Sequence, residues 1–128
     1  MSASNYAENK LVDHLLGTTT FTKPTAVYLG LFTADPGEGA TGPEVAGLGY
    51  ARQAAQFSAA NAGTARNTSL IVFPAATGGA WGTITHFGIF DAATGGNLLV
   101  KGAFDSSRVI GDTDALLVNA NDLAVTLD

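Results

Sequence analysis

Alternating apolar residues over positions 81–91 constrain the fold of this chain more than any other feature. The sequence there reads Trp-Gly-Thr-Ile-Thr-His-Phe-Gly-Ile-Phe-Asp, and successive side chains of a β-strand point to opposite faces. One face would carry Trp81, Phe87 and Ile89, and the other Ile84, His86 and Phe90. Both faces therefore have apolar surface to bury. The turn at 91–96 contains two glycines and lets residues 97–104 run back, so we predict a long buried strand within a β-hairpin.

Further short apolar runs between glycine-rich turns predict a mainly β chain. The expected strands are residues 25–33, 50–57, 69–73, 108–110, 115–118 and 123–127. Residues 25–33 have apolar side chains on both faces, which is typical of a buried strand. Residues 34–48 and 58–68 are predicted loops. Seven to eight strands without a linker or repeat predict one domain over residues 1–128, an antiparallel β-sandwich of immunoglobulin-like or jelly-roll-like type.

One short helix is predicted near the N-terminus, at residues 5–16. Asn5 would cap it, Glu8 would complete a capping box, and Gly17 would end it. A stripe of four apolar side chains follows helical spacing: Leu11, Val12, Leu15 and Leu16. Such a short helix needs a surface to pack on. Its own sheet and a neighbouring subunit both remain open as that surface, so the helix is a candidate docking element.

Composition narrows the classes of partner. Charged residues make up only 13% of the chain, against about 25% in a typical soluble domain, which favours a surface partly buried against other chains and a homo-oligomer. Six Lys and Arg residues are scattered and the net charge is −5, so direct nucleic-acid binding is not expected. The chain has no cysteine, no apolar run long enough for a membrane, and no signal-peptide pattern at its start. We therefore expect synthesis and folding in the cytoplasm.

Catalytic and metal-binding patterns are weak. His14 lies on the helix and His86 in an apolar strand, and neither has a nucleophile beside it in sequence. Aspartates and asparagines at residues 112–122 resemble turn residues more than a calcium loop, because the bidentate glutamate is missing. We predict no enzymatic activity, no metal and no cofactor. Trp81, Tyr50 and Tyr28 would suit a carbohydrate site if they were exposed, which keeps a glycan-binding module as the alternative.

The long loop at 34–48 is a second candidate contact surface. Its length exceeds that of most connections, and such loops are usually functional or mobile. It carries Asp35, Glu38 and Glu44 and no basic residue. The candidate interface residues are therefore Leu11, Val12, Leu15 and Leu16 on the helix and Asp35, Glu38 and Glu44 on the loop.

Several segments together resemble a family of small tailed-phage virion proteins, often labelled phage tail fibre proteins. They are residues 8–16 (ENKLVDHLL), 26–36 (AVYLGLFTADP), 49–53 (GYARQ), 67–74 and 81–95. The resemblance covers nearly the whole chain and implies a structural role in the virion, with no catalytic residue to carry over. No coiled-coil heptads, collagen-like triplets or repeats are present to form a shaft.

We therefore expect a compact unit, either a capsid decoration or cement protein or a tail-fibre-type module. Its partners would be major capsid or tail proteins and further copies of itself in a homo-oligomer such as a trimer. The alternative is an adsorption module that binds host glycans.

Overall fold

The computed structural model describes residues 1–127 and confirms a mainly β fold with one short helix near the N-terminus. Chain order is β1 (Ser2–Ala3), α1 (Asn5–Leu15), β2 (Val27–Phe32), β3 (Gln53–Ala55), β4 (Thr64–Arg66), β5 (Ile71–Val72), β6 (Gly82–Phe90), β7 (Leu98–Ile110), β8 (Leu117–Val118) and β9 (Ala124–Thr126). Within residues 1–127 nine strands form where seven to eight were expected, because β1 and β4 were not predicted and the strand predicted at 108–110 is part of β7.

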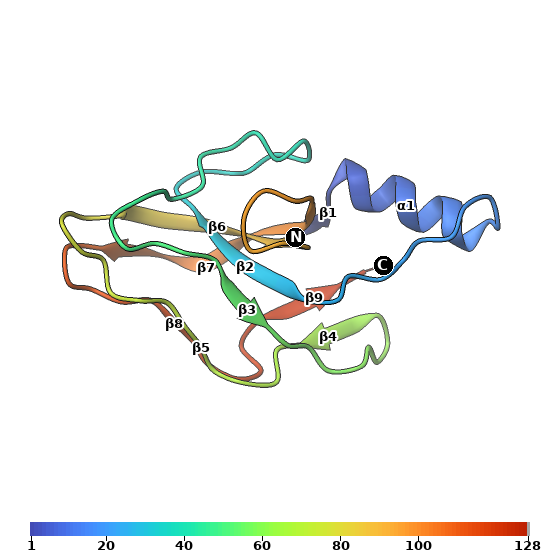
Figure 1. Ribbon diagram of the computed structural model, residues 1–128. Coiled ribbons are helices and arrows are strands. Elements are labelled where there is room, and N and C mark those ends of the chain that lie inside the picture. The colour runs from blue at the N-terminus through green and yellow to red at the C-terminus, as the bar shows by residue number, and fades with distance from the viewer. Residues whose placement is uncertain (128) are drawn as a thin grey trace.

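Two layers of antiparallel strands make up the body (Figure 1). The main sheet has the order β1-β7-β6-β2-β3, so β6 is its central strand. The second layer consists of two separate ladders, β4 with β9 and β5 with β8. The predicted hairpin is present, because β6 and β7 pair along most of their length around the turn at 91–96.

A single large apolar cluster joins the two layers. The main sheet contributes Leu29, Leu31 and Phe87, and the second layer contributes Ile71 and Leu123. A smaller cluster of Phe32, Phe90 and Leu98 lies on the other face of the main sheet. Strand β2 therefore buries side chains on both faces, as its sequence predicts.

The face assignment within β6 was wrong for Ile84. Simple alternation put Ile84 on the face opposite Phe87, but both are buried in the large cluster. The register explains the difference, since Ile84 pairs with Arg108 whereas His86 pairs with Ala103. An irregularity between these pairs changes the phase of alternation. The predicted partners Phe87 and Ile89 do share a face.

Several expected boundaries also differ. The separately predicted strand at 108–110 is the end of a continuous β7, and the strand expected at 50–57 shortens to Gln53–Ala55. The predicted loop at 58–68 contains β4, which pairs with β9. The unexpected β1 extends the main sheet beside Val100 and Lys101 of β7. Each of these short strands depends on a partner far away in sequence.

Ser4, rather than Asn5, caps α1. The Ser4 hydroxyl accepts the backbone N–H of Ala7 at 3.1 Å and donates to the carbonyl of Leu98. The backbone N–H of Asn5, which Glu8 would accept in the predicted capping box, donates instead to the carbonyl of Glu38, so the box does not form. At the other end, Gly17 has φ 78° and donates to His14, while Thr18 donates to Asp13. This is a Schellman motif, which ends the helix where the sequence placed its stop.

Candidate functional site

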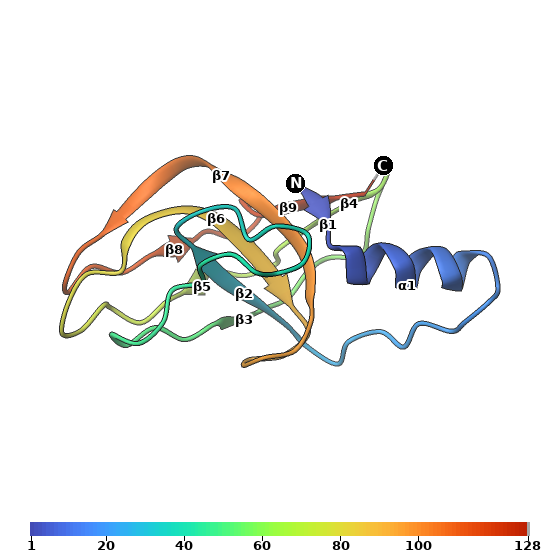
Figure 2. The same cartoon turned by 90° about the horizontal axis from the view of Figure 1, so that it is seen from above.

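The outward face of α1 is the clearest unpartnered apolar surface. Val12 is 53% exposed, Leu15 is 77% exposed and Leu16 is 75% exposed. Helix α1 projects from one end of the β body, and its last turn lies far from the main sheet (Figure 2). Three of the four predicted stripe residues therefore expose apolar area to water. This exposure is unfavourable in free energy, and a bound partner would remove it.

The inner face of the same helix is attached to the body. Ala7 is buried, and Leu11 one turn later is half-buried. Both line a small apolar pocket of about 190 Å³ with Phe21, Leu99 and Val125. Ala7 and Leu11 therefore pack on the chain's own strands, whereas Leu15 and Leu16 are exposed, and docking on a neighbouring subunit stays a prediction.

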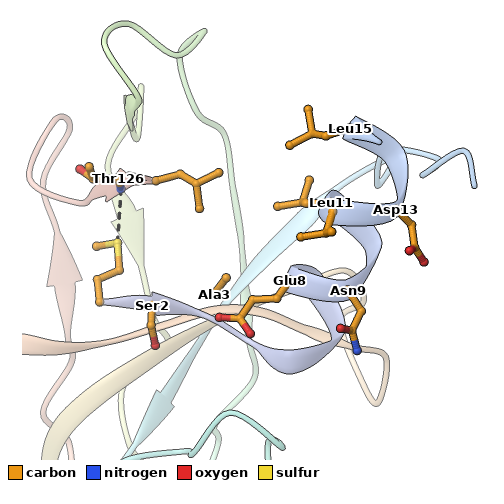
Figure 3. A pocket seen from close by; sticks show the side chains of 11 residues that line it. Ser2, Ala3, Glu8, Asn9, Leu11, Asp13, Leu15 and Thr126 are labelled. Atoms are coloured by element: carbon orange, nitrogen blue, oxygen red, sulfur yellow. Dashed lines mark hydrogen bonds between the residues drawn. The ribbon is translucent and has the colours of Figure 1, made fainter. Parts of the chain in front are cut away.

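An open cleft separates α1 from the end of β9 (Figure 3). Its volume is about 670 Å³, within the range of sites that hold ligands or partner side chains. Leu11 and Leu15 point into it from the helix, opposite Thr126 (Figure 3). Met1 and Leu127, which are 56% and 59% exposed, complete its apolar lining.

Charge around the cleft is acidic. Glu8 and Asp13 are among its lining residues, and no lysine or arginine is. The cleft would therefore favour an apolar partner surface that carries positive charge.

The loop at 34–48 obtains opposite charges from elsewhere in the chain. Lys101 Nζ lies 3.1 Å from Asp35 Oδ1. The backbone N–H of Gly37 and the Lys101 ammonium lower the pKa of Asp35. Glu38 is exposed, and its carbonyl accepts the backbone N–H of Asn5 at the start of α1. The loop therefore lies against the helix that forms the other predicted contact element.

Glu44, by contrast, belongs to an internal network around Arg52. Arg52 donates to Glu44 through Nη2 at 2.7 Å and Nε at 2.8 Å, a bidentate pair. Its Nη1 also donates to the carbonyls of Ala92 and Gly95, and the guanidinium lies 3.5 Å above the Phe90 ring. The network joins the 34–48 loop to the β6–β7 turn, so Arg52 holds these two connections side by side.

Tyr50 extends this network toward the core. Its hydroxyl donates to Glu44 at 2.7 Å and accepts the backbone N–H of Leu31 at 3.0 Å. Burial and the bond to Glu44 raise the pKa of Tyr50 far above its ordinary value. The hydroxyl therefore stays protonated and serves as a structural donor.

Trp81, one of the three aromatic residues considered for sugar stacking, is not accessible. Trp81 is 6% exposed, its indole Nε1 donates to the carbonyl of Leu48, and its ring packs edge-on against Tyr50. Neither face of Trp81 is free for a carbohydrate. This counts against a glycan site built on Trp81 and Tyr50.

The two histidines have local hydrogen bonds. His14 Nδ1 accepts the backbone N–H of Phe21 at 3.0 Å and holds the return segment against the helix. His86 Nδ1 lies 2.7 Å from the hydroxyl of its neighbour Thr85. Within residues 1–127, no three His, Asp or Glu side chains gather as a metal site would require. Over the same residues, no helix combines the length and apolar character that crossing a membrane would take.

Sequence reasoning missed three residues of the cleft region. Leu127 was expected only as the last residue of the strand at 123–127, yet it is 59% exposed and lines the cleft. Met1 and Phe21 were not singled out. Hydrophobicity alone was a signal for all three, but only the folded chain shows that β1, β9 and α1 meet here.

The chain was also compared with known proteins. A family model described as "Podophage GP4 fiber I protein gp80" matches residues 2–126. The match includes α1 and every strand of both layers. No curated protein matches the sequence.

Proposed function

Because this chain belongs to the podophage GP4 fiber I protein family, we propose that it is a non-enzymatic structural module that docks on another virion subunit through α1. Family membership implies a place in the virion and association with other virion components. The finer proposal is that the β-sandwich is a compact unit attached at the capsid or tail surface. A capsid-decorating position and a tail-fibre position would both use such a docking element.

The exposed outer face of α1 is the observation that carries this proposal. Val12, Leu15 and Leu16 contribute apolar area that is in water in the isolated chain. Burying one such side chain is worth about 1.5–3 kcal/mol. Many copies on one particle would add to the strength of each contact through avidity.

The 34–48 loop supplies a second, polar contact surface. Asp35 and Glu38 are exposed on it, and the Arg52 network fixes its far end to the β6–β7 turn. A fixed loop loses less conformational entropy when it binds than a mobile one. Because Glu44 is committed to Arg52, we assign the polar contacts to Asp35 and Glu38.

Incorporation into particles tests the role of α1. We expect the double substitution Leu15→Asp and Leu16→Asp to fold normally, because both side chains are exposed, and to be strongly depleted from purified virions. Virions would be produced with only the variant chain, and its content measured by quantitative mass spectrometry. Ala59→Asp, at an exposed loop position remote in sequence from α1, is the matched control.

Wild-type incorporation of the folded double variant would overturn the proposal. Deletion of residues 1–17 is a less specific test, because it also removes the buried residues Ser4 and Ala7. Circular dichroism of each purified variant separates a folding defect from a docking defect.

A further inference from the structure

Eight of the ten exposed large apolar side chains within residues 1–127 form two groups, and the other two are Leu48 on the 34–48 loop and Val109 on β7. One group is on α1 and beside its cleft: Met1, Val12, Leu15, Leu16 and Leu127. The other is on β5, β8 and the segment before β5: Leu70, Val72 and Leu117. Helix α1 projects from one end of the body, whereas β5 and β8 lie toward the other (Figures 1 and 2). One chain therefore carries two separate apolar surfaces.

The side chains on the outer face of the β5–β8 ladder are about half exposed. Val72 pairs directly with Leu117, and these side chains are 48% and 49% exposed. Their neighbours Ile71 and Val118 point inward and are buried in the large cluster. Because the second layer is a two-stranded ladder here, no other element within residues 1–127 covers its outer face. We call Leu70, Val72 and Leu117 the β5–β8 patch.

One basic residue beside the β5–β8 patch is available to pair with the acidic residues of α1, and Asp122 lies beside the same patch. Leu117 shares a shallow pocket of about 290 Å³ with Arg108 and Asp122. Arg52 and Lys101 pair with Glu44 and Asp35 inside the chain. Within residues 1–127, Arg108 forms no such ion pair, so its guanidinium is free for a partner. Glu8 and Asp13 on α1 supply the carboxylates that such a partner would need.

We propose that α1 of one copy docks on the β5–β8 patch of a neighbouring copy, with Glu8 and Asp13 toward the neighbour's Arg108. This inference rests on the proposed function and names the subunit that receives the helix. In an assembly of such copies, a single type of contact would bury both the apolar group at α1 and the β5–β8 patch. Such an interface is heterologous, so repetition gives a closed ring or an open chain rather than an isolated twofold dimer.

Cysteine cross-linking of the purified chain tests which surfaces meet. The natural sequence contains no cysteine, so Leu15→Cys and Leu117→Cys each introduce one reactive thiol. The two variants, carrying tags of different mass, are mixed in equal amounts and treated with a short bismaleimide. We expect the mixed product to exceed the products of either variant alone by at least about tenfold. Leu15→Cys mixed with Ala59→Cys is the matched control, because Ala59 is exposed outside both surfaces.

Three results would overturn the inference. Efficient cross-linking of Leu15→Cys with itself would show that two helices pair with each other. A mixed product no greater than that of the Ala59→Cys control would show that the patch does not receive the helix. A chain that stays monomeric at every concentration would show that its partner is a different protein. The experiment contains no particles, so wild-type virion incorporation of the Leu15→Asp and Leu16→Asp variant alongside the expected cross-linking would overturn only the proposed function.

Discussion

At the scale of single residues, Arg52 has the most concentrated set of contacts in the chain. Two of its nitrogen atoms donate to Glu44, and a third donates to two carbonyls of the β6–β7 turn. Its side chain is only 9% exposed. Removing one partner of a buried ion pair costs about 3–5 kcal/mol. Glu44 retains 22% of its side-chain exposure, so we expect Arg52→Met to lower the free energy of unfolding by somewhat less, about 2–4 kcal/mol.

Urea denaturation of the two single variants Arg52→Met and Arg66→Met, each compared with the wild type, measures this loss in the free energy of unfolding. Arg66 is exposed and makes one hydrogen bond to the Asn121 carbonyl, so its removal should change stability by no more than about 0.5–1 kcal/mol. Equal losses in the two variants would mean that the Arg52 network contributes nothing beyond an ordinary surface contact.

Asp91 should make part of the stability depend on pH. Partial burial raises its pKa, but the backbone and side-chain donors of Asn97 outweigh this effect, and the net pKa is lowered. The unfolded chain then binds a proton at higher pH than the folded chain does, so this stabilisation is present above the ordinary carboxyl pKa. It is lost as the pH falls through the lowered folded value.

Unfolding of Asp91→Asn followed from pH 7 to pH 2 checks that sign. The variant should lose less stability on acidification than the wild type. Asp105→Asn, which removes a carboxylate from an exposed position on β7, is the control. If Asp91→Asn lost as much stability on acidification as the wild type does, Asp91 would not be a source of the pH dependence.

At the scale of elements, the start of α1 distinguishes two possible caps. Ser4 accepts the N–H of Ala7, donates to Leu98 and is 1% exposed, whereas Asn5 is exposed. Loss of a helix cap costs about 0.5–2 kcal/mol. Because Ser4→Ala also leaves a buried carbonyl without its donor, we expect a loss of about 1–2 kcal/mol. Asn5→Ala should cost less than about 0.5 kcal/mol in the same thermal unfolding experiment. Similar losses of stability in the two variants would mean that Ser4 and Asn5 both contribute to the helix cap.

Elements with a strong local pattern could be predicted from the sequence, and those with distant partners could not. The hairpin of β6 and β7, the strand β2 and the helix α1 all follow from apolar periodicity and turn residues. The choice of Asn5 as cap failed because Leu98 and Leu99, which hold Ser4 in place, are remote in sequence. The face of Ile84 failed because a register irregularity is set by the pairing strand.

The candidate site also combines residues that a local sequence pattern indicates with residues that only the fold brings together. Leu15 and Leu16 were selected by helical spacing, and their exposure agrees with a contact role that is still untested. Leu127 and Met1 join them only because β1 and β9 end beside the helix. Glu44 looked available as a loop carboxylate, but Arg52, eight residues later, engages it. Nothing in the spacing of these two residues indicates that bidentate contact.

At the scale of the whole molecule, a heterologous contact predicts how damaged copies complement one another. Leu15→Asp disables the helix and leaves the β5–β8 patch intact, while Leu117→Asp does the reverse. Both positions are exposed, so each variant should fold and remain monomeric in sedimentation velocity experiments. In an equal mixture, the intact helix of one variant meets the intact patch of the other. No working surface is left to add a third copy, so assembly should stop at dimers, whereas the wild type reaches trimers or larger species. Failure of the mixture to form dimers, or dimers as the largest wild-type species, would contradict docking of α1 on a neighbour's β5–β8 patch.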